Sequence, residues 1–194
     1  MPPRNDIILH DCEGKHPCDP LVKKITGLLV PKNDPAVYEN MFALLERAWG
    51  KPERISQRFP FTWTDYYRDI SPELDRIFFS YPGLCPASKL PDWKTESCSI
   101  EKQTGKSRRV NIDPGAVDGA KLLLASTKGQ AQRVYLRDGI FCEVTLCRRK
   151  GKWEHFSYTF PDFSSGIYDS WLETVREDWK KEIKQAEAIL QFNK

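Results

Sequence analysis

Apolar residues recur at helical spacing in two long stretches of the chain. The first lies between Asp34 and Gly50, where apolar side chains return every three or four positions, and it predicts an amphipathic helix. Asp34 is suited to cap this helix, Pro35 to form its first turn and Gly50 to end it. The second stretch runs from Tyr168 to Leu190 beside a Glu/Lys/Arg face. It predicts a long carboxyl-terminal helix that lies across a sheet.

Short apolar runs elsewhere in the first half of the chain predict strands. Residues 25–30 (ITGLLV) suit a buried strand. Residues 53–61 (ERISQRFPF) predict a second strand, in which Pro60 marks either the end or a sheet edge. Residues 75–82 (DRIFFSYP) predict a third strand, and residues 92–103 predict a further helix.

The segment from residue 108 to residue 128 predicts a strand, a turn and a helix. Residues 108–112 (RRVNI) form the expected strand, and Asp113-Pro114-Gly115 the expected turn or helix start. Residues 119–128 (GAKLLLASTK) are interpreted as a helix with its leucines directed inward.

Three strand-like runs between residues 134 and 158 predict an antiparallel meander. They are joined by Asp138-Gly139 and Lys150-Gly151, pairs that favour the two-residue turns of β-hairpins. Pairing through these turns places Glu143 on the central strand.

The order of elements predicts one α+β domain over residues 23–194. We expect an antiparallel or mixed sheet with helices packed mainly on one face and a long carboxyl-terminal helix. A chain of 194 residues suits a single compact domain. Residues 1–22 are polar and contain proline without a sustained period, so we expect them to form a poorly ordered arm.

Composition narrows the class of protein but not its activity. Hydrophobic residues make up 40% and charged residues 29% of the chain, as in ordinary globular proteins. The amino-terminal residues lack the apolar core of a signal peptide, and no run of about 18 apolar residues exists, so we expect a cytosolic protein with reduced cysteines. The net charge of +3 is too small to indicate nucleic acid by itself.

Polar residues that could bind a ligand concentrate between residues 108 and 145. On a strand Arg109, Asn111 and Asp113 would share one face and align a cation, an amide and a carboxylate. The predicted helix after them would begin with free N–H groups that suit a phosphate or carboxylate. In the alternative interpretation Asp113 caps the helix, Gly115 makes the turn and the basic side chains are solvated. Further candidates for ligand binding are Lys121, Thr127, Lys128 and Arg133.

Glu143 is a carboxylate in the central strand of the predicted meander. Its expected neighbours are Val134 on one side and Tyr158 on the other. If a helix covers it, Glu143 needs a basic partner, and its pKa could be shifted enough for acid or base chemistry. The alternative is a half-exposed strand face with an ordinary ion pair.

An aromatic stretch lies between Phe59 and Tyr67, where Arg58 and Arg68 flank it. It could stack on bases, or it could simply pack around an irregular turn. Asp65 is the one acidic residue within it. We consider Asp65 either a helix cap or a further carboxylate of the site, beside Asp113 and Glu143.

The amino-terminal arm carries residues whose types suit zinc. The four residues are His10, Cys12, His16 and Cys18. They form two H-x-C units, a spacing that matches no standard zinc finger or ribbon. The alternative is that they are incidental in a tail, and we assign no metal site.

Several common catalytic motifs are absent from the sequence. They are the motifs of P-loops, dinucleotide-binding turns, HExxH metalloproteases and serine hydrolases.

Several of these motifs, in this order, resemble the prokaryotic domain-of-unknown-function family 4416. They are FPFTWTDYY, RRVNIDPG, AKLLLASTK, RVYLRDGIFCEVTL and YTFPDF. The resemblance runs from about Ile25 to about Asp178 and implies a small bacterial or archaeal cytosolic protein with no established activity. It singles out Asp65, Tyr66, Arg109, Asn111, Asp113, Gly115, Lys121, Thr127, Lys128, Arg133, Glu143, Thr159, Pro161 and Asp162.

Three functional hypotheses follow from the sequence. The first is a domain that binds or acts on a phosphate-bearing small molecule or nucleotide through a basic and carboxylate pocket, with Mg²⁺ as a cofactor that such a ligand could bring. The second is an RNA- or DNA-binding module whose affinity falls steeply with salt. The third is a non-catalytic protein that binds a partner through an exposed apolar stripe on its terminal helix.

Overall fold

The computed structural model describes residues 19–105 and 108–192. Its strands are β1 (Leu21–Pro31), β2 (Arg54–Ile55), β3 (Phe59–Phe61), β4 (Leu74–Ser80), β5 (Cys85–Pro86), β6 (Asn111–Val117), β7 (Lys121–Ser126), β8 (Val134–Arg137), β9 (Ile140–Arg149) and β10 (Lys152–His155). Its helices are α1 (Pro35–Trp49), α2 (Leu90–Gln103), α3 (Pro161–Ser164) and α4 (Asp169–Phe192), with 3-10 turns η1 (Asp65–Tyr67) and η2 (Ala87–Lys89).

The α+β class, the antiparallel sheet and the long carboxyl-terminal helix are confirmed. The strand order is β10-β9-β7-β6-β1-β4-β2, and neighbouring strands are antiparallel. Most of the predicted amino-terminal arm, with its four candidate zinc ligands, lies outside the described residues. Leu21 and Val22, the last two residues of that arm, already belong to β1.

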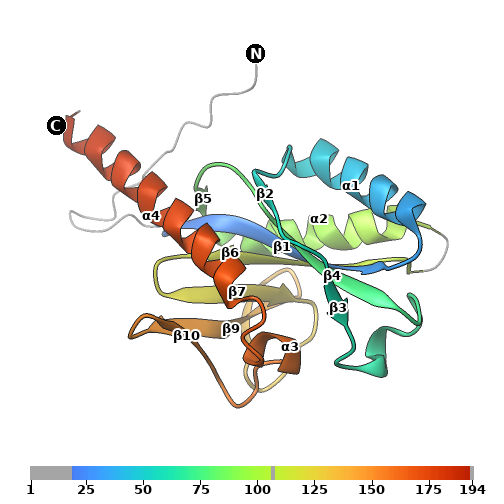
Figure 1. Cartoon of the computed structure of the whole chain (residues 1–194). Coiled ribbons are helices and arrows are strands. Elements are labelled where there is room, and N and C mark those ends of the chain that lie inside the picture. Colours follow the sequence, from blue (N-terminus) through green and yellow to red (C-terminus); the bar gives the residue numbers. More distant parts are fainter. Residues whose placement is uncertain (1–18, 106–107, 193–194) are drawn as a thin grey trace.

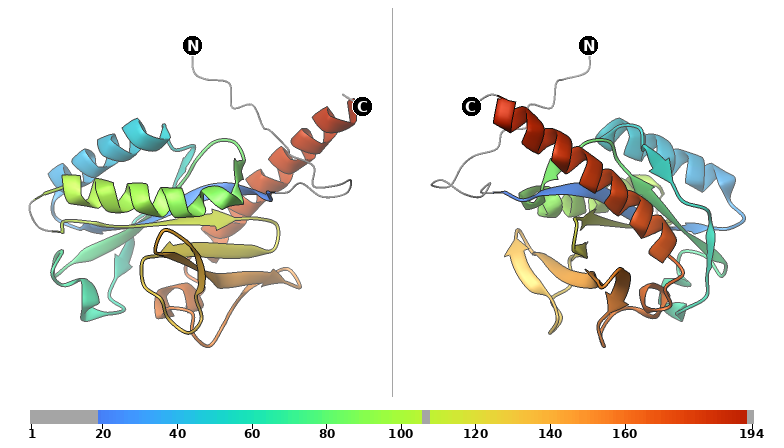
Figure 2. Two further views of the ribbon diagram at one scale, coloured as in Figure 1. Left: turned by 180° about the vertical axis from the view of Figure 1, so that it is seen from behind. Right: turned by 60° about the vertical axis from the view of Figure 1, so that its left-hand side comes forward.

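Helices cover both faces of the sheet (Figures 1 and 2), so the prediction that they pack mainly on one face is wrong. Every residue of β1 is buried, because this strand lies in the middle and alternate side chains enter two different cores. Leu28 packs with residues of α1 and α2, whereas Ile25 packs with residues of α4 and the segment before it. The chain therefore has one apolar layer on each side of the sheet.

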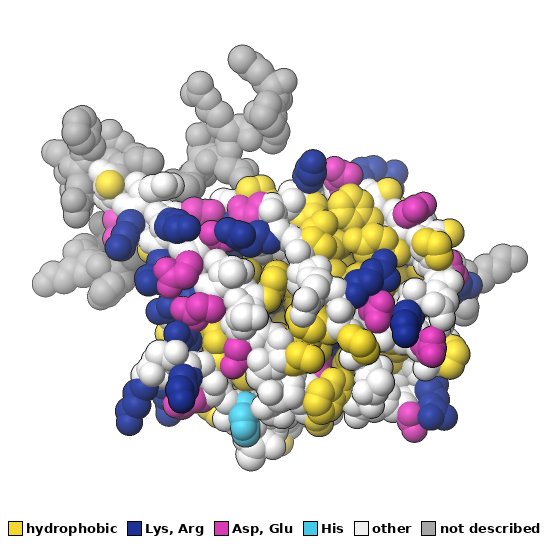
Figure 3. All heavy atoms as spheres, in the orientation of Figure 1, with side chains coloured by type: hydrophobic (Ala, Val, Ile, Leu, Met, Phe, Trp, Pro, Cys, Tyr) yellow, Lys and Arg dark blue, Asp and Glu magenta, His cyan; other side chains and the backbone are white. Residues whose placement is uncertain are grey.

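The two long predicted helices form as their sequence patterns indicate. At the start of α1 the Asp34 carboxylate accepts a hydrogen bond from the Val37 N–H at 3.2 Å, and Gly50 follows the helix with a φ of 82°. Leu172 and Val175 of α4 are buried against the sheet, while acidic and basic side chains lie next to one another along its outer surface (Figure 3). None of the described helices combines the length and apolar character needed to cross a membrane.

The prediction of a turn and a helix between residues 113 and 128 is wrong. Asp113, Pro114 and Gly115 lie inside β6, and residues 121–126 form β7 beside it. Leu122 enters the core under α4, whereas Leu123 packs against the opposite core with α2. A short apolar run that packs on both faces shows neither the 3.6-residue period of a helix nor the two-residue period of a strand. Its sequence pattern therefore does not distinguish a helix from a strand.

Gly115 is required by the close approach of β6 and β7. A Cβ atom at this position would lie 2.5 Å from the Leu123 carbonyl oxygen and 2.8 Å from Leu124 Cδ2. We therefore expect Gly115→Ala to lower the free energy of unfolding by roughly 2 kcal/mol or more, as overpacking typically does, measured by urea denaturation. A loss well below 1 kcal/mol, the lower end of typical overpacking costs of about 1 to 3 kcal/mol, would contradict the close approach.

The remaining strand predictions hold with two corrections. The predicted strand over residues 53–61 is divided into β2 and β3, which pair separately with β4. The meander of β8, β9 and β10 is confirmed, but neither predicted neighbour of Glu143 is correct. On one side Leu124 of β7 pairs with Glu143 in place of Tyr158, because β10 ends at His155. On the other side Val134 faces Cys142 rather than Glu143. The reason is an irregularity between Tyr135 and Arg137, which shifts the register by one residue.

Lys24 of β1 is a buried lysine enclosed by aromatic rings. Its Nζ lies 3.5 Å from the ring centroid of Trp49 and 5.1 Å from those of Tyr81 and Trp93. Within residues 19–105 and 108–192 no carboxylate comes within ion-pair distance of it. Burial lowers the pKa of Lys24 to about 7, and the nearby Glu96 only partly opposes this effect.

Candidate functional site

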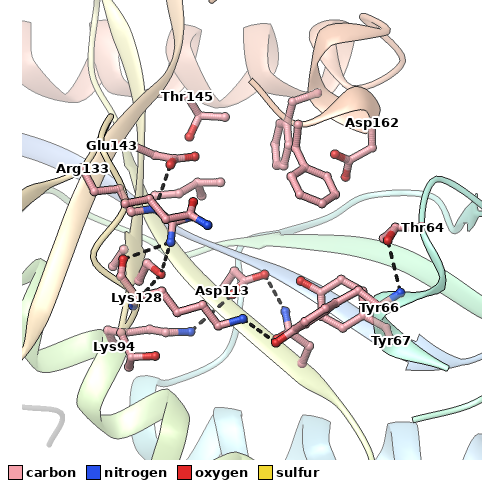
Figure 4. A pocket seen from close by; sticks show the side chains of 18 of the residues that line it. Thr64, Tyr66, Tyr67, Lys94, Asp113, Lys128, Arg133, Glu143, Thr145 and Asp162 are labelled. Carbon is pink, nitrogen blue, oxygen red and sulfur yellow. Dashed lines mark hydrogen bonds and ion pairs between the residues drawn. The ribbon is translucent and has the colours of Figure 1, made fainter. Parts of the chain in front are cut away.

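A pocket of about 660 Å³ opens where β6 and β7 separate. In the described chain β6 pairs with β7 over Gly115–Val117, so the first half of β6 borders a cavity instead of a strand. The opposite wall comes from η1, and α3 lies above (Figure 4). In this view Asp113 lies between Lys128 and Arg133 on one side and the η1 tyrosines on the other.

Asp113 forms the floor of the pocket and is held by two cations. Its Oδ1 lies 3.3 Å from Lys94 Nζ, and its Oδ2 lies 3.6 Å from Arg76 NH1 and accepts a hydrogen bond from the Asn111 amide. Lys94 comes from α2 and Arg76 from β4, and both are buried. Burial alone would raise the pKa of Asp113, but Lys94 and Arg76 outweigh it and hold this pKa below the ordinary value. Asp113 is therefore ionised.

Asp162 forms the opposite, upper part of the pocket. It lies in the single turn of α3, where its side chain is fully buried. Its Oδ2 lies 3.3 Å from Arg76 NH2 and accepts a hydrogen bond from the Tyr168 hydroxyl at 3.2 Å. Burial raises the pKa of Asp162, and Arg76 only partly reverses this shift. Arg76 is thus shared by two carboxylates whose pKa values move in opposite directions.

Glu143 and Arg133 form an ion pair on the wall made by the meander. Arg133 Nε lies 2.8 Å from Glu143 Oε2, and its NH1 donates to Ser126 Oγ at 2.7 Å and to the Lys128 carbonyl at 3.1 Å. Glu143 therefore has the basic partner expected of a covered carboxylate. The same contacts anchor the loop between β7 and β8, which carries Thr127 and Lys128.

Two further cations reach the pocket but contact neutral groups. Lys128 Nζ donates to the Tyr66 hydroxyl and lies 4.2 Å from the centroid of that ring. The hydrogen bond from Lys128 lowers the pKa of Tyr66. Arg108 donates to the side-chain oxygen Oδ1 of Asn111 and lies over the Tyr67 ring at 5.3 Å. Burial, reinforced by Asp113, raises the pKa of Tyr67 to about 12, so this hydroxyl stays protonated.

Three buried polar atoms around the pocket have no hydrogen-bond partner among the described residues. They are Arg76 Nε, Thr145 Oγ1 and Asp162 Oδ1. Buried polar groups are almost always paired with protein, water or ligand. All three belong to residues that line the pocket.

The structure brings together six of the nine candidate site residues. Asn111, Asp113, Thr127, Lys128, Arg133 and Glu143 all line the pocket. The other three do not line it and pair elsewhere: Asp65 with Arg68 at the exposed surface, Arg109 with Asp34 at the start of α1, and Lys121 with Asp118.

The proposed anion site at a helix amino terminus is also wrong, because β7 stands where that helix was expected. Residues that sequence reasoning missed include Arg76, Lys94 and Glu101. The one signal that could have identified Arg76 is a cation inside the otherwise apolar strand DRIFFSYP.

The pocket carboxylates do not fit a magnesium site made by the protein alone. Asp113, Asp162 and Glu143 each face an arginine or lysine, whereas Mg²⁺ needs carboxylate charge that is free to bind it. In the described part of the chain there is also no group of three His, Cys, Asp or Glu side chains arranged to hold a metal ion. No role for the pocket is therefore derived through a metal.

Comparison with known proteins identifies the family of the chain. Neither the curated proteins nor the solved structures give a match. The model of the family described as "Domain of unknown function (DUF4416)" matches residues 20–179. This match covers most of the chain, including β1, every wall of the pocket and the first part of α4. The chain therefore belongs to the DUF4416 family.

Proposed function

We propose that the pocket binds a small molecule that carries a phosphate group, such as a nucleotide or a phosphosugar. The observation that carries this proposal is the surplus of basic groups around the pocket. Five basic and four acidic side chains line the pocket, and Arg108 and Lys128 contact neutral partners there. A phosphate would supply the missing negative charge and accept charge-assisted hydrogen bonds.

Aromatic residues at the rim favour a ligand with a planar part. Tyr66, Tyr158 and Phe160 line the pocket and are exposed. Such rings can stack on a nucleobase while the cations hold the phosphate. This combination favours a nucleotide over a phosphosugar.

A thermal-shift screen tests the proposal directly. The probes are inorganic phosphate, nucleoside phosphates, phosphosugars and short RNAs, each with and without Mg²⁺. A ligand at about 100 times its Kd stabilises the folded state by about 2.7 kcal/mol, which corresponds to a rise in Tm of roughly 5 to 10 °C for a domain of this size. If no phosphate-bearing probe raises the Tm of the wild type, the proposal fails.

Lys128→Ala is expected to weaken binding of the best probe by roughly tenfold to a hundredfold, the value of one charge-assisted hydrogen bond. Arg109→Ala is the matched control, because Arg109 pairs with Asp34 outside the pocket, and it should bind like the wild type. Isothermal titration calorimetry measures both affinities. Equal loss in the two variants would place the binding site elsewhere.

Binding of RNA or single-stranded DNA is the second candidate. Trp63 and Tyr66 are both exposed, and Tyr66 contacts Lys128, which together resemble a surface on which bases stack. A high ratio of absorbance at 260 to 280 nm in purified protein, together with strong salt dependence of RNA binding, would favour this candidate. The apolar stripe of α4 is buried against its own sheet at Leu172 and Val175, so it offers no argument for binding a partner.

A further inference from the structure

Four of the five described cations that line the pocket are matched by a carboxylate. On the wall made by the meander, Arg133 Nε lies 2.8 Å from Glu143 Oε2. The other three cations face three carboxylates on the floor and in the upper part of the pocket. They are Arg76, Lys94 and Arg108, and they face Asp113, Asp162 and Glu101. This leaves one cation of the described pocket, Lys128, without a matching acid.

Lys128 lies at an exposed position in the loop between β7 and β8. Among the described residues, its ammonium group contacts only neutral partners, the hydroxyl and the ring of Tyr66. Its backbone carbonyl accepts a hydrogen bond from Arg133 NH1 at 3.1 Å, so the loop is attached to the ion pair of Arg133 and Glu143. The surplus positive charge of the pocket therefore lies at a defined place on the rim.

The carboxylates of the pocket limit how much negative charge a ligand can bring. Asp113 and Glu143 both line the pocket near Lys128 (Figure 4). Asp113 is ionised, and Glu143 is held by its ion pair with Arg133. One negative charge on the ligand is neutralised by Lys128. A second negative charge would meet no unmatched cation among the described residues and would be repelled by the carboxylates.

Phosphate esters differ in the charge that they carry near neutral pH. A monoester, such as a nucleoside monophosphate, carries close to two negative charges, because its second proton is lost with a pKa of about 6. A phosphodiester has no second acidic proton and carries one negative charge, whereas a polyphosphate carries more than a monoester. The diester is therefore the phosphate whose charge equals the surplus of the pocket.

We propose that the pocket selects a nucleoside phosphodiester, whose single negative charge binds Lys128 while a base stacks on the aromatic residues of the rim. This selectivity rests on the proposed function, because it requires a phosphate-bearing ligand in the pocket. Tyr66, Tyr158 and Phe160 supply the exposed rings. A volume of about 660 Å³ is typical of sites for small molecules. Cyclic mononucleotides and dinucleoside monophosphates share the required chemistry.

The first experiment changes only the charge of the phosphate. Nucleoside monophosphates with each of the common bases are compared with their methyl esters by isothermal titration calorimetry near neutral pH, without Mg²⁺. Methylation keeps the base, the sugar and the phosphorus but removes one charge. For the preferred base the ester should therefore bind roughly tenfold more tightly than the monophosphate, and the triphosphate should bind more weakly than either. If the monophosphate or the triphosphate binds at least as tightly as the ester, the proposal is overturned.

The second experiment changes the charge of the protein with the same pair of probes. Thr127→Lys adds a cation at an exposed position of the pocket next to Lys128. It should favour the monophosphate over the ester by roughly tenfold relative to the wild type, so that the preference for the ester disappears. Asn40→Lys is the matched control, because it adds the same charge at an exposed position of α1 outside the pocket, and it should keep the wild-type preference. If both variants keep this preference while their circular dichroism stays native, charge does not set it and the proposal is overturned.

The outcomes separate this proposal from the proposed function. If monophosphates bind and their esters do not, the pocket still binds phosphate and the proposed function stands, but the preference for a diester is overturned. If no phosphate-bearing probe binds the wild type, both fail. Cyclic AMP and the dinucleoside monophosphate ApA then identify the kind of diester. Tighter binding of either than of AMP supports the proposal, and the tighter of the two indicates whether the ligand is cyclic or a dinucleotide.

Discussion

Asp113→Ala is expected to lower the free energy of unfolding by about 3 kcal/mol, because it leaves two buried cations without their shared counter-ion. Lys94 and Arg76 each contact the Asp113 carboxylate, and only Arg76 has a second acidic partner, Asp162. The loss should be measured by urea denaturation at pH 7. Binding of phosphate-bearing probes should be lost in the same variant, since the two cations that Asp113 orders also shape the pocket floor.

The effect of Asp113 should depend on pH in a defined direction. Its pKa is lower in the folded state than in the unfolded chain, so its contribution is present above the unfolded pKa of about 4 and is lost as pH falls below that value. The difference between wild type and Asp113→Ala should therefore shrink on acidification. Asp138→Asn, at an exposed turn position with a φ of 52°, is the control and should change stability by less than about 0.5 kcal/mol.

Lys24→Met is expected to be more stable than the wild type at pH 7. The wild type should gain stability between pH 7 and pH 9.5, and the variant should lack much of this gain. The pKa of Lys24 is about 7 in the folded protein, against 10.5 for an ordinary lysine. Below pH 7 the folded protein bears the full cost of a buried ammonium, and the cost decreases as pH rises toward the unfolded pKa. At about 1.4 kcal/mol per pH unit, the change in stability between pH 7 and pH 9.5 is on the order of 3 kcal/mol.

Urea denaturation at pH 7 and 9.5 measures this difference. Other groups titrate in the same range, so the comparison is between variants rather than between pH values alone. Lys51→Met, at an exposed position, should keep the wild-type pH dependence. A flat stability difference between wild type and Lys24→Met from pH 7 to 9.5 would show that the aromatic rings of Trp49, Tyr81 and Trp93 compensate the burial fully.

Local sequence patterns predicted the elements that have one buried face. α1 and α4 have one apolar stripe each, and the turns of the meander contain Gly139 and Gly151, which adopt positive φ. The patterns failed for β6 and β7, which pack against a core on each face and therefore carry no clear period. Gly115 illustrates the difficulty. Its sequence context is typical of a turn, but a glycine is needed here because the Leu123 carbonyl of the next strand leaves no room for a side chain.

The pocket was predictable only where its residues are close together in the sequence. One segment, residues 108–145, was identified by its concentration of polar side chains. It supplies Asn111, Asp113, Lys128, Arg133 and Glu143. Arg76, Lys94 and Asp162 come from three other elements. Only the register of β4 against β1 and of β1 against β6 brings Arg76 to Asp113, and no single-segment pattern contains this information.

The contact between Lys128 and Tyr66 joins two segments that are far apart in the sequence. The two residues are 62 positions apart, and their hydrogen bond spans from the loop after β7 to η1 at the rim. An ammonium group has three N–H donors, so Lys128 could bind the phosphate of the proposed ligand while it keeps its contact with the Tyr66 hydroxyl. The tyrosine would then hold this cation at the rim before the ligand arrives, which lowers the entropy that binding has to cost.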